Sequence, residues 1–407
     1  MIALEAPKKF EALVGQARHV AAEVFRPISR KYDLAEHEYP KELDMLASLI
    51  DGMNEGGDGD GAGAALVRRK SRNRGDGSNR NGSNMLTVLT IIELCWGDVG
   101  LLLSMPRQGL GNSAIASVAT EEQLERYGGR WAAMAITEPE AGSDSAAIRT
   151  TAVLEGEEYV LNGEKIYVTS GERAELVVVW ATLDRSRGRS AIRSFVVERS
   201  NPGLKLERLD HKLGIRASDT ASFRLEDCRV PAQALLGSAE KAEQDVKQGF
   251  GGAMQTFDNT RPLVAAMAVG VARASLQETR EQLAQAGVEV DYAKAPLTQS
   301  AAAARFLELE ADYEAARLLT LQAAWMADNG KPNSLQASIA KAKAGRTCVE
   351  VALGCVELCG SVGYGEQELL EKWARDAKIL DIFEGTQQIQ LLIVARQLLG
   401  RGSDELK

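Results

Sequence analysis

A glutamate between two helical segments is the residue of this chain that is best placed to do chemistry. Apolar residues recur at helical spacing over residues 378–383 and 389–399, and Glu384-Gly385-Thr386 interrupts them. The glycine lets the backbone leave helical geometry. Two interpretations stay open. Glu384 is a solvated side chain beside a helix C-cap glycine, or it is a general base close to a new helix N-terminus that could bind an anionic cofactor.

The histidine and cysteine content argues against several other chemistries. The three histidines are His19, His37 and His211, and none pairs with a cysteine or an acid at metal-ligand spacing. The sequence therefore predicts no metal site and no histidine-based triad. The five cysteines are odd in number and lie mostly in apolar helical text, which predicts free, buried thiols.

Length and charge limit the class of protein. A chain of 407 residues exceeds what one hydrophobic core usually serves, so two or three domains are expected. The net charge of -9 argues against a nucleic-acid or membrane-surface role. No run approaches the roughly 20 apolar residues of a membrane span, and the start has no signal-peptide core. We expect a cytoplasmic protein without nucleic-acid partners or membrane spans.

Periodicity divides the chain into three parts and predicts an α+β multidomain fold. Residues 1–131 have the pattern of a helical domain, although 51–84 are rich in glycine and arginine and are predicted to be a flexible loop. Residues 132–243 alternate apolar and polar positions between glycine and asparagine turns, which predicts an antiparallel β-barrel or sandwich. Residues 244–407 predict long helices in an up-and-down four-helix bundle.

Four motifs, in this order along the chain, resemble those of the acyl-CoA dehydrogenase family. They are Ala135-Ile136-Thr137-Glu138-Pro139-Glu140-Ala141-Gly142-Ser143-Asp144, Lys212-Leu213-Gly214-Ile215-Arg216-Ala217-Ser218-Asp219-Thr220, Phe257-Asp258-Asn259-Thr260-Arg261-Pro262 and Phe383-Glu384-Gly385-Thr386. The resemblance covers nearly the whole chain except residues 51–84, and it is closest to the straight-chain, medium-chain-like members.

The resemblance implies an FAD-dependent oxidation of acyl-CoA thioesters to trans-2-enoyl-CoA, as in fatty acid β-oxidation. In that chemistry Glu384 removes the α-proton, the β-hydride passes to the flavin, and an electron-transfer flavoprotein is the expected acceptor. Some branches of the family take the base from an acid immediately before the arginine that matches Arg261. Here that position is Thr260, which has no carboxylate, so Glu384 is expected to be the base.

The same resemblance implies which other residues form the site. Tyr167-Val168-Thr169 matches a Trp-Ile-Thr stretch that lies against the flavin ring, with tyrosine in place of tryptophan. The residues implied to bind the cofactor are Met134, Ile136, Thr137, Gly142, Ser143, Tyr167, Val168, Thr169, Gly385, Thr386 and Gln388. Those implied to bind the substrate are Ser143, Asp258, Arg261 and Glu384, although a buried ion pair inside the bundle is the alternative for Arg261.

The chain departs from the family where a neighbouring subunit usually donates flavin contacts. Ungapped counting puts Glu289 in place of an arginine, Ser300 near a glutamine and Glu357 in place of a second glutamine. Acidic side chains repel a pyrophosphate. Two assemblies are therefore open, a homotetramer and a mixed tetramer with a homologous subunit that completes the FAD site.

Three further functions remain as alternatives. The chain could be an acyl-CoA oxidase-like enzyme that passes electrons to oxygen, and reoxidation in air separates this from a dehydrogenase. It could be a non-catalytic partner subunit, against which the presence of Glu384 argues. It could be a helical module that binds CoA thioesters without redox chemistry, which the flavin-facing motif disfavours.

Overall fold

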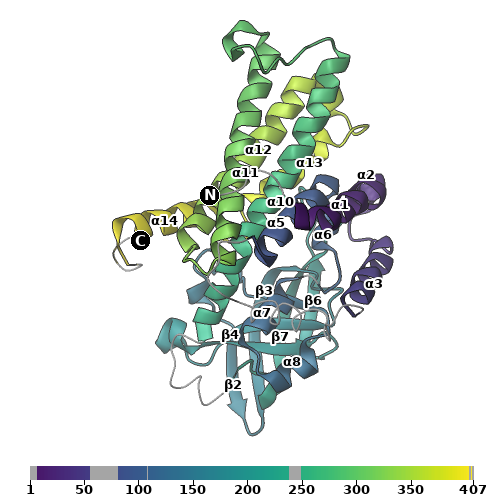
Figure 1. The fold of residues 1–407 in the computed structure, drawn as a ribbon. Coiled ribbons are helices and arrows are strands. Elements are labelled where there is room, and N and C mark those ends of the chain that lie inside the picture. Colours follow the sequence, from purple (N-terminus) through teal and green to yellow (C-terminus); the bar gives the residue numbers. More distant parts are fainter. Residues whose placement is uncertain (1–6, 56–80, 108, 238–248, 403–404, 406–407) are drawn as a thin grey trace.

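The computed structural model describes residues 7–55, 81–107, 109–237, 249–402 and 405, with 49–55 and 249–259 described for the backbone alone. Helices come first, a sheet follows, and long helices complete the chain. Figure 1 shows the strands gathered at one end of the molecule, the long helices at the other, and α1 to α3 beside the point where the two meet.

The first part of the chain consists of short helices. They are α1 (Glu11–Val20), α2 (Arg26–Leu34), α3 (Glu42–Glu55), α5 (Ser83–Gly97), α6 (Val99–Leu103), α7 (Leu110–Val118) and α8 (Glu121–Tyr127). A capping box begins α8, because the Thr120 hydroxyl accepts from the Gln123 amide while the Gln123 side chain accepts from the Thr120 amide.

The predicted loop over 51–84 is wrong at both of its ends. Helix α3 continues to Glu55 and α5 already begins at Ser83. The apolar spacing that predicts α3 from Leu43 onward continues across Asp51 and Gly52, so the helix tolerates the first glycine. Residues 56–80, which hold the glycine-rich and arginine-rich text, lie outside the described residues.

Seven strands among the described residues form one curled sheet. They are β1 (Ala132–Ala135), β2 (Thr151–Glu155), β3 (Glu158–Thr169), β4 (Leu176–Thr182), β5 (Ile192–Glu198), β6 (Leu204–Leu209) and β7 (Thr220–Pro231). Their order is β1-β4-β2-β3-β7-β6, and β5 pairs with β4. Every residue of β4 is buried. Val177 and Val179 pack into one apolar cluster and Val178 into another, so side chains cover both faces of this strand.

The fold class agrees with the prediction, but the sheet is not purely antiparallel. Strand β4 pairs in parallel with β1 and, through Thr151 and Thr182, with β2. The remaining strand pairs are antiparallel. Alternation of apolar residues reports the faces of a strand and not its direction, which is why the sequence did not reveal the parallel pairs.

The last part of the chain is the helical bundle, built from α10 (Gly249–Gln285), α11 (Ala301–Asp328), α12 (Ser334–Tyr364), α13 (Leu370–Leu380) and α14 (Gln387–Leu399). The sequence predicts a helix that begins at Pro262, whereas α10 passes through this proline. Helix α12 contacts α10, α11, α13 and α14, and α5 packs against α10 and α11. The largest apolar core of the described residues lies among these helices.

Helix α12 is, among the described residues, the one helix whose length and composition would allow it to cross a membrane. A core helix passes the same test. Helix α12 buries Cys348, Val351 and Cys355 against its neighbours. It also carries the buried Lys341, whose cationic side chain is costly inside a bilayer. These contacts describe a central bundle helix.

Candidate active site

Glu384 lies in a tight turn between α13 and α14. The Gln387 amide donates to the Asp381 carbonyl at 3.1 Å and closes the turn. Glu384 has φ 58° and Gly385 has φ 88°, and the first value is uncommon for a residue with a Cβ. A Cβ on Gly385 would lie 2.4 Å from Gln390 Nε2. Gly385 thus belongs to this turn and is not the C-cap of α13, which is Asp381.

The carboxylate of Glu384 is held by α10. The Thr260 hydroxyl donates to Glu384 Oε2 at 2.8 Å. Surrounding protein raises the pKa of Glu384 by desolvation, while the Thr260 hydrogen bond and the charges of Lys341 and Arg261 act in the opposite direction. Glu384 keeps some exposed surface although its carboxyl is desolvated. These observations disfavour a solvated glutamate and describe a desolvated carboxylate held by a hydrogen bond.

Two side chains hold the backbone of this turn. The Lys341 ammonium, on the buried side of α12, donates to the Gly385 carbonyl at 2.7 Å. The Gln390 amide donates to the carbonyls of Glu384 and Gly385 at 3.1 and 3.3 Å. Desolvation lowers the pKa of Lys341 to about 8, while the charges of Asp381 and Glu384 act to raise it. The sequence did not single out Lys341, because Lys343 and Arg346 lie close by in the same helix and spacing alone does not show which of these cations is buried.

A second group of predicted residues lies at the end of the sheet, where β1 and β3 come together. The Ile166 amide donates to the Thr137 carbonyl at 2.9 Å. Beneath this contact the fully buried Lys165 donates to the Ile136 carbonyl at 3.1 Å and to Glu138 Oε1 at 2.7 Å. Glu138 also accepts from the Thr150 hydroxyl at 2.6 Å. This buried ion pair joins residues 134–143 to residues 165–169, and nothing in the sequence pattern indicates it.

Tyr167 is held outward at this junction. Its φ is 58° and its residue is 62% exposed, so a strained backbone presents an aromatic face to the surroundings. Gly142 and Ser143 are exposed, whereas Met134, Thr137 and Thr169 are half-buried. Ile136 and Val168 are buried in the sheet core, which leaves only their backbone groups to face a ligand. An exposed aromatic ring at the end of the sheet where the half-buried Thr137 and Thr169 also lie fits a planar, polar-edged ring such as the flavin implied by the family resemblance.

The loop over residues 210–219 connects this end of the sheet to α13. The Ser170 amide donates to the Asp219 carbonyl at 3.1 Å, and the Ile215 amide donates to Asp376 Oδ1 at 2.5 Å. A Cβ on Gly214 would lie 2.5 Å from the Arg375 carbonyl carbon. The Lys212–Thr220 motif is therefore a close backbone contact between the sheet and the helix that ends just before Glu384.

A buried charge network fixes α13 from the other side. The Lys372 ammonium lies 2.6 Å from Asp376 Oδ2 and 2.8 Å from Asp98 Oδ2, and all three residues are essentially without exposed surface. The Ser29 hydroxyl donates to Asp98. Since Asp98 caps α6 and Ser29 lies on α2, the network connects the N-terminal helices to the helix that carries the Glu384 turn.

For the remaining residues predicted to bind cofactor or substrate, the structure gives fewer contacts. Thr386 is the N-cap of α14, where its side chain accepts from the Ile389 amide at 3.4 Å, and Gln388 is exposed in the first turn of that helix. Arg261 is 6% exposed and lies 3.5 Å from the Ser338 hydroxyl. The side chain of Asp258 lies outside the described residues.

Known protein families match both the sheet and the C-terminal helical bundle, the two parts of the chain that carry the residues described above. The middle domain of acyl-CoA dehydrogenases matches residues 133–228, and the C-terminal domain of acyl-CoA dehydrogenases matches residues 247–399. Together these segments include Glu384, Thr260, Lys341 and the contact between β1 and β3.

Curated relatives give the same family. The short-chain specific acyl-CoA dehydrogenase of Clostridium acetobutylicum is 34% identical over 325 residues, which are 78% of this chain and 82% of the relative. The mitochondrial short-chain specific acyl-CoA dehydrogenase of Rattus norvegicus is 39% identical over 272 residues, which are 65% of this chain and 62% of that enzyme.

Solved structures agree over nearly the whole length. Butyryl-CoA dehydrogenase from Megasphaera elsdenii superposes with a TM-score of 0.80 at 30% identity and covers 98% of this chain and 100% of its own. A chain from the structure of the electron transferring flavoprotein of Acidaminococcus fermentans gives a TM-score of 0.78 at 30% identity, with 98% and 100% coverage. The chain therefore belongs to the acyl-CoA dehydrogenase family of FAD-dependent enzymes.

Proposed function

We propose that Glu384 is the base with which this enzyme removes the α-proton of an acyl-CoA thioester, in an oxidation that yields the trans-2-enoyl-CoA. The observation that carries the proposal is the environment of its carboxylate. Desolvation raises its pKa while the Thr260 hydroxyl donates to it at 2.8 Å. A carboxylate is ordinarily a weak base for a carbon acid, and desolvation strengthens it.

The surroundings of Glu384 also keep it ionised. Lys341 and Arg261 are buried cations whose charges favour the carboxylate form. The hydrogen bond from Lys341 to the Gly385 carbonyl supports a fixed backbone position for the base. The action of the Arg261 charge on the pKa of Glu384 supports a position near the reacting end of the site. A contact of Arg261, Asp258 and Ser143 with the CoA portion stays a prediction.

We assign the flavin ring to the exposed face of Tyr167, with Met134, Ile136, Thr137, Gly142, Ser143, Val168 and Thr169 along its edge. FAD, when bound, accepts the hydride that leaves the β-carbon. Gly385, Thr386 and Gln388 stand at the N-terminus of α14, where the positive end of the helix dipole suits the anionic dinucleotide. The protein contributes binding and orientation through these groups.

Mixing with thioesters under anaerobic conditions tests the proposal. The relatives named short-chain specific support a short, straight acyl chain as the first substrate, so butyryl-CoA heads a panel that extends to longer and branched chains. We expect loss of the flavin absorbance with at least one member and formation of the enoyl-CoA. No bleaching across the panel by FAD-loaded protein would contradict the proposal. Rapid reoxidation in air would instead identify the oxidase-like alternative.

We further infer a tetramer in which a homologous subunit completes the FAD site, and an electron-transfer flavoprotein as the acceptor. The exposed acids Glu289 and Glu357 support the first point, because they occupy positions where family members usually carry neutral or basic donors. The similarity to a chain from an electron transferring flavoprotein structure supports the second. A role in fatty acid β-oxidation and a cytoplasmic location stay predictions.

A further inference from the structure

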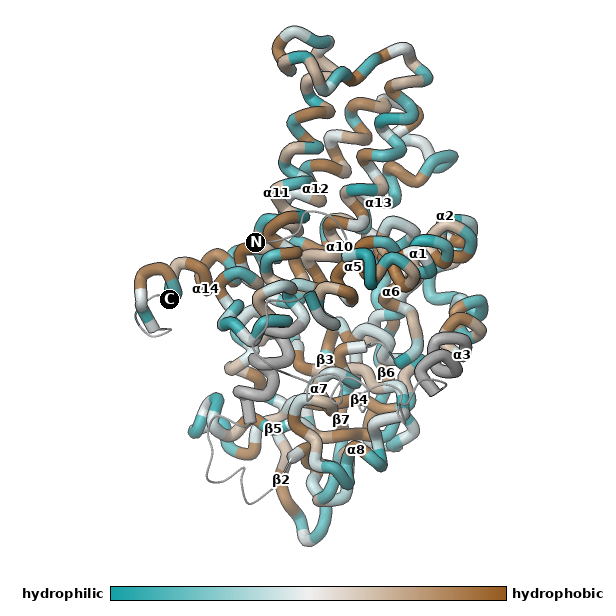
Figure 2. Tube along the Cα trace, viewed as in Figure 1, coloured by the Kyte–Doolittle hydropathy of each residue, from teal (hydrophilic) through white to brown (hydrophobic). Residues whose placement is uncertain are grey.

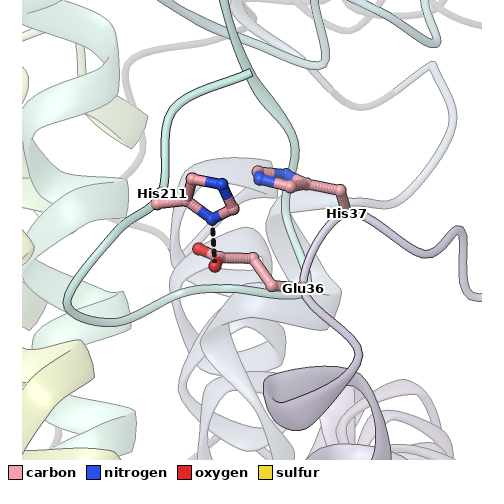
Figure 3. A group of neighbouring side chains, drawn as sticks. All are labelled: Glu36, His37 and His211. Atoms are coloured by element: carbon pink, nitrogen blue, oxygen red, sulfur yellow. Dashed lines mark hydrogen bonds and ion pairs between the residues drawn. The ribbon is translucent and has the colours of Figure 1, made fainter. Parts of the chain in front are cut away.

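Two histidines and a glutamate that are far apart in sequence meet at the surface, away from the Glu384 turn. Glu36 and His37 follow α2, and His211 lies in the loop between β6 and β7. One donor atom from each residue lies within 4.8 Å of the others. Figure 3 shows both imidazole rings and the carboxylate turned toward one another. Sequence spacing does not indicate this group, because 173 residues separate His37 from His211.

The positions of the donors are built into the backbone. His37 has φ 73°, a left-handed conformation that is uncommon for residues other than glycine. The Arg173 guanidinium donates to the carbonyls of His37 and Glu38 at 3.3 and 3.2 Å and holds this turn. Strained backbone that its surroundings hold in place is a recurrent property of ligand sites.

His37 is the residue whose contacts are incomplete. Both of its ring nitrogens are buried and have no hydrogen-bond partner among the residues that the structure describes, although buried polar groups in proteins nearly always have one. Its ring centroid lies 4.9 Å from that of His211. An imidazole nitrogen with no protein partner, turned toward a second imidazole and a carboxylate, is an available ligand.

Glu36 is oriented from behind, as metal-binding carboxylates usually are. Its Oε1 accepts from the Lys212 amide at 2.8 Å, and its Oε2 lies 2.8 Å from His211 Nδ1. The nearby Lys212 ammonium donates to the Ser218 carbonyl at 2.7 Å. That contact directs the positive charge toward the loop interior.

We propose that Glu36, His37 and His211 form a binding site for a divalent transition-metal ion of the Zn²⁺ type. Two imidazole nitrogens and one carboxylate oxygen are ligands that Zn²⁺ accepts, and water would complete a four-coordinate site. Zn²⁺ holds such ligands at about 2.0–2.2 Å, so the donors must move closer together, and the exposed His211 side chain has room to rotate toward the other two.

The metal would connect the segment after α2 to the loop of residues 210–219. The same loop contacts α13 through Gly214 and Ile215. An ion at this position would therefore stiffen the junction between the N-terminal helices and the sheet. It has no part in the α-proton chemistry, so the inference is independent of the proposed function.

Zn²⁺ titration of the chelator-treated, FAD-loaded protein tests the inference. We expect saturable binding of one Zn²⁺ per chain by calorimetry, and a Co²⁺ derivative whose visible spectrum reports imidazole and carboxylate ligands. His211→Ala should weaken Zn²⁺ binding at least tenfold, and its exposed position makes loss of folding no obstacle. Glu36→Gln should weaken binding in the same direction.

The chain supplies two matched controls. His19 is exposed and lies on α1, so His19→Ala should bind Zn²⁺ like the parent. Cys359 is the one cysteine that is not fully buried, and Cys359→Ser excludes binding through a thiol. Unchanged Zn²⁺ affinity in His211→Ala, or loss of the site in Cys359→Ser alone, would overturn the inference.

Discussion

At the scale of single residues, Thr260 is expected to tune the base although a hydroxyl cannot itself serve as that base. Its hydroxyl is the hydrogen-bond donor to the carboxylate of Glu384. The base must be ionised, so activity is lost as the pH falls through the pKa of Glu384. The hydroxyl lowers that pKa, against the larger effect of desolvation. Losing the hydroxyl therefore raises the pKa.

Thr260→Val should shift the acid limb of the kcat/KM profile upward. A hydrogen bond to a charged group contributes roughly 1.5 kcal/mol, which corresponds to about one pH unit. Thr260→Ser keeps the hydroxyl and should keep the limb in its original place. If the acid limb of the kcat/KM profile of Thr260→Val lies at the same pH as in the parent, the hydrogen bond does not act on the base.

Lys341 acts on the same carboxylate through charge and through the backbone. Lys341→Met removes both the cation and the hydrogen bond to the Gly385 carbonyl, so we expect a raised acid limb and a lower kcat/KM.

Stability provides a separate readout for Lys341. Its pKa is about 8 in the folded chain and 10.5 ordinarily, so the unfolded chain binds more protons between these values. The parent's stability should therefore rise from about pH 8 to 10.5 relative to Lys341→Met. If the thermal midpoints of the parent and of Lys341→Met change with pH in parallel, the pKa of Lys341 is not lowered by burial in the folded chain.

At the scale of elements, the contact between residues 210–219 and α13 sets the position of the Glu384 turn. A Cβ at position 214 would meet the backbone of Arg375 and Asp376 at 2.5 to 2.6 Å. Backbone atoms cannot yield as a flexible side chain can. Gly214→Ala should cost about 1–3 kcal/mol of stability and lower kcat/KM by displacing α13.

Gly129→Ala is the matched control for Gly214→Ala. A Cβ there meets nothing within 4 Å, so thermal midpoint and activity should both stay at parental values. Equal effects of the two substitutions, measured by thermal unfolding and steady-state kinetics, would refute the role of the loop contact.

The elements also show what the sequence could predict. Helical periodicity located α14, and the Glu384-Gly385 break was visible because glycine disrupts a helical pattern. The segment predicted as helical over 378–383 was wrong in its bounds, because α13 spans Leu370–Leu380 and residues 381–383 already belong to the turn. The residues that contact the Glu384 turn could not be predicted from the sequence. Thr260, Lys341 and the pair Glu138–Lys165 act through contacts between distant segments, and neither composition nor spacing encodes such contacts. The start of α10 was misplaced for a local reason, since Pro262 is typical of helix starts but is tolerated inside this helix.

At the scale of the whole molecule, apolar side chains remain exposed on α14. Leu391, Leu398 and Leu399 are 52%, 68% and 64% exposed. Figure 2 shows α14 carrying hydrophobic positions where it extends from the bundle. Exposed apolar surface of this kind is typical of interfaces between subunits, and it supports the proposed tetramer.

The mixed assembly predicts the FAD content of the protein. The chain purified alone should hold much less than one FAD per chain, and Glu289→Arg should raise the ratio by removing an acid and restoring a donor. Absorbance spectra combined with light scattering measure ratio and assembly together. A yellow homotetramer with one FAD per unmodified chain would exclude the need for a homologous partner.

The most direct measurement for the whole account is the rate of flavin bleaching by an active acyl-CoA in Glu384→Gln. The substitution keeps the size and the backbone of the turn but removes the base. We predict unchanged FAD content and thioester binding, with bleaching slowed by about 10²- to 10⁴-fold. Bleaching at the parental rate would contradict Glu384 as the base that removes the α-proton.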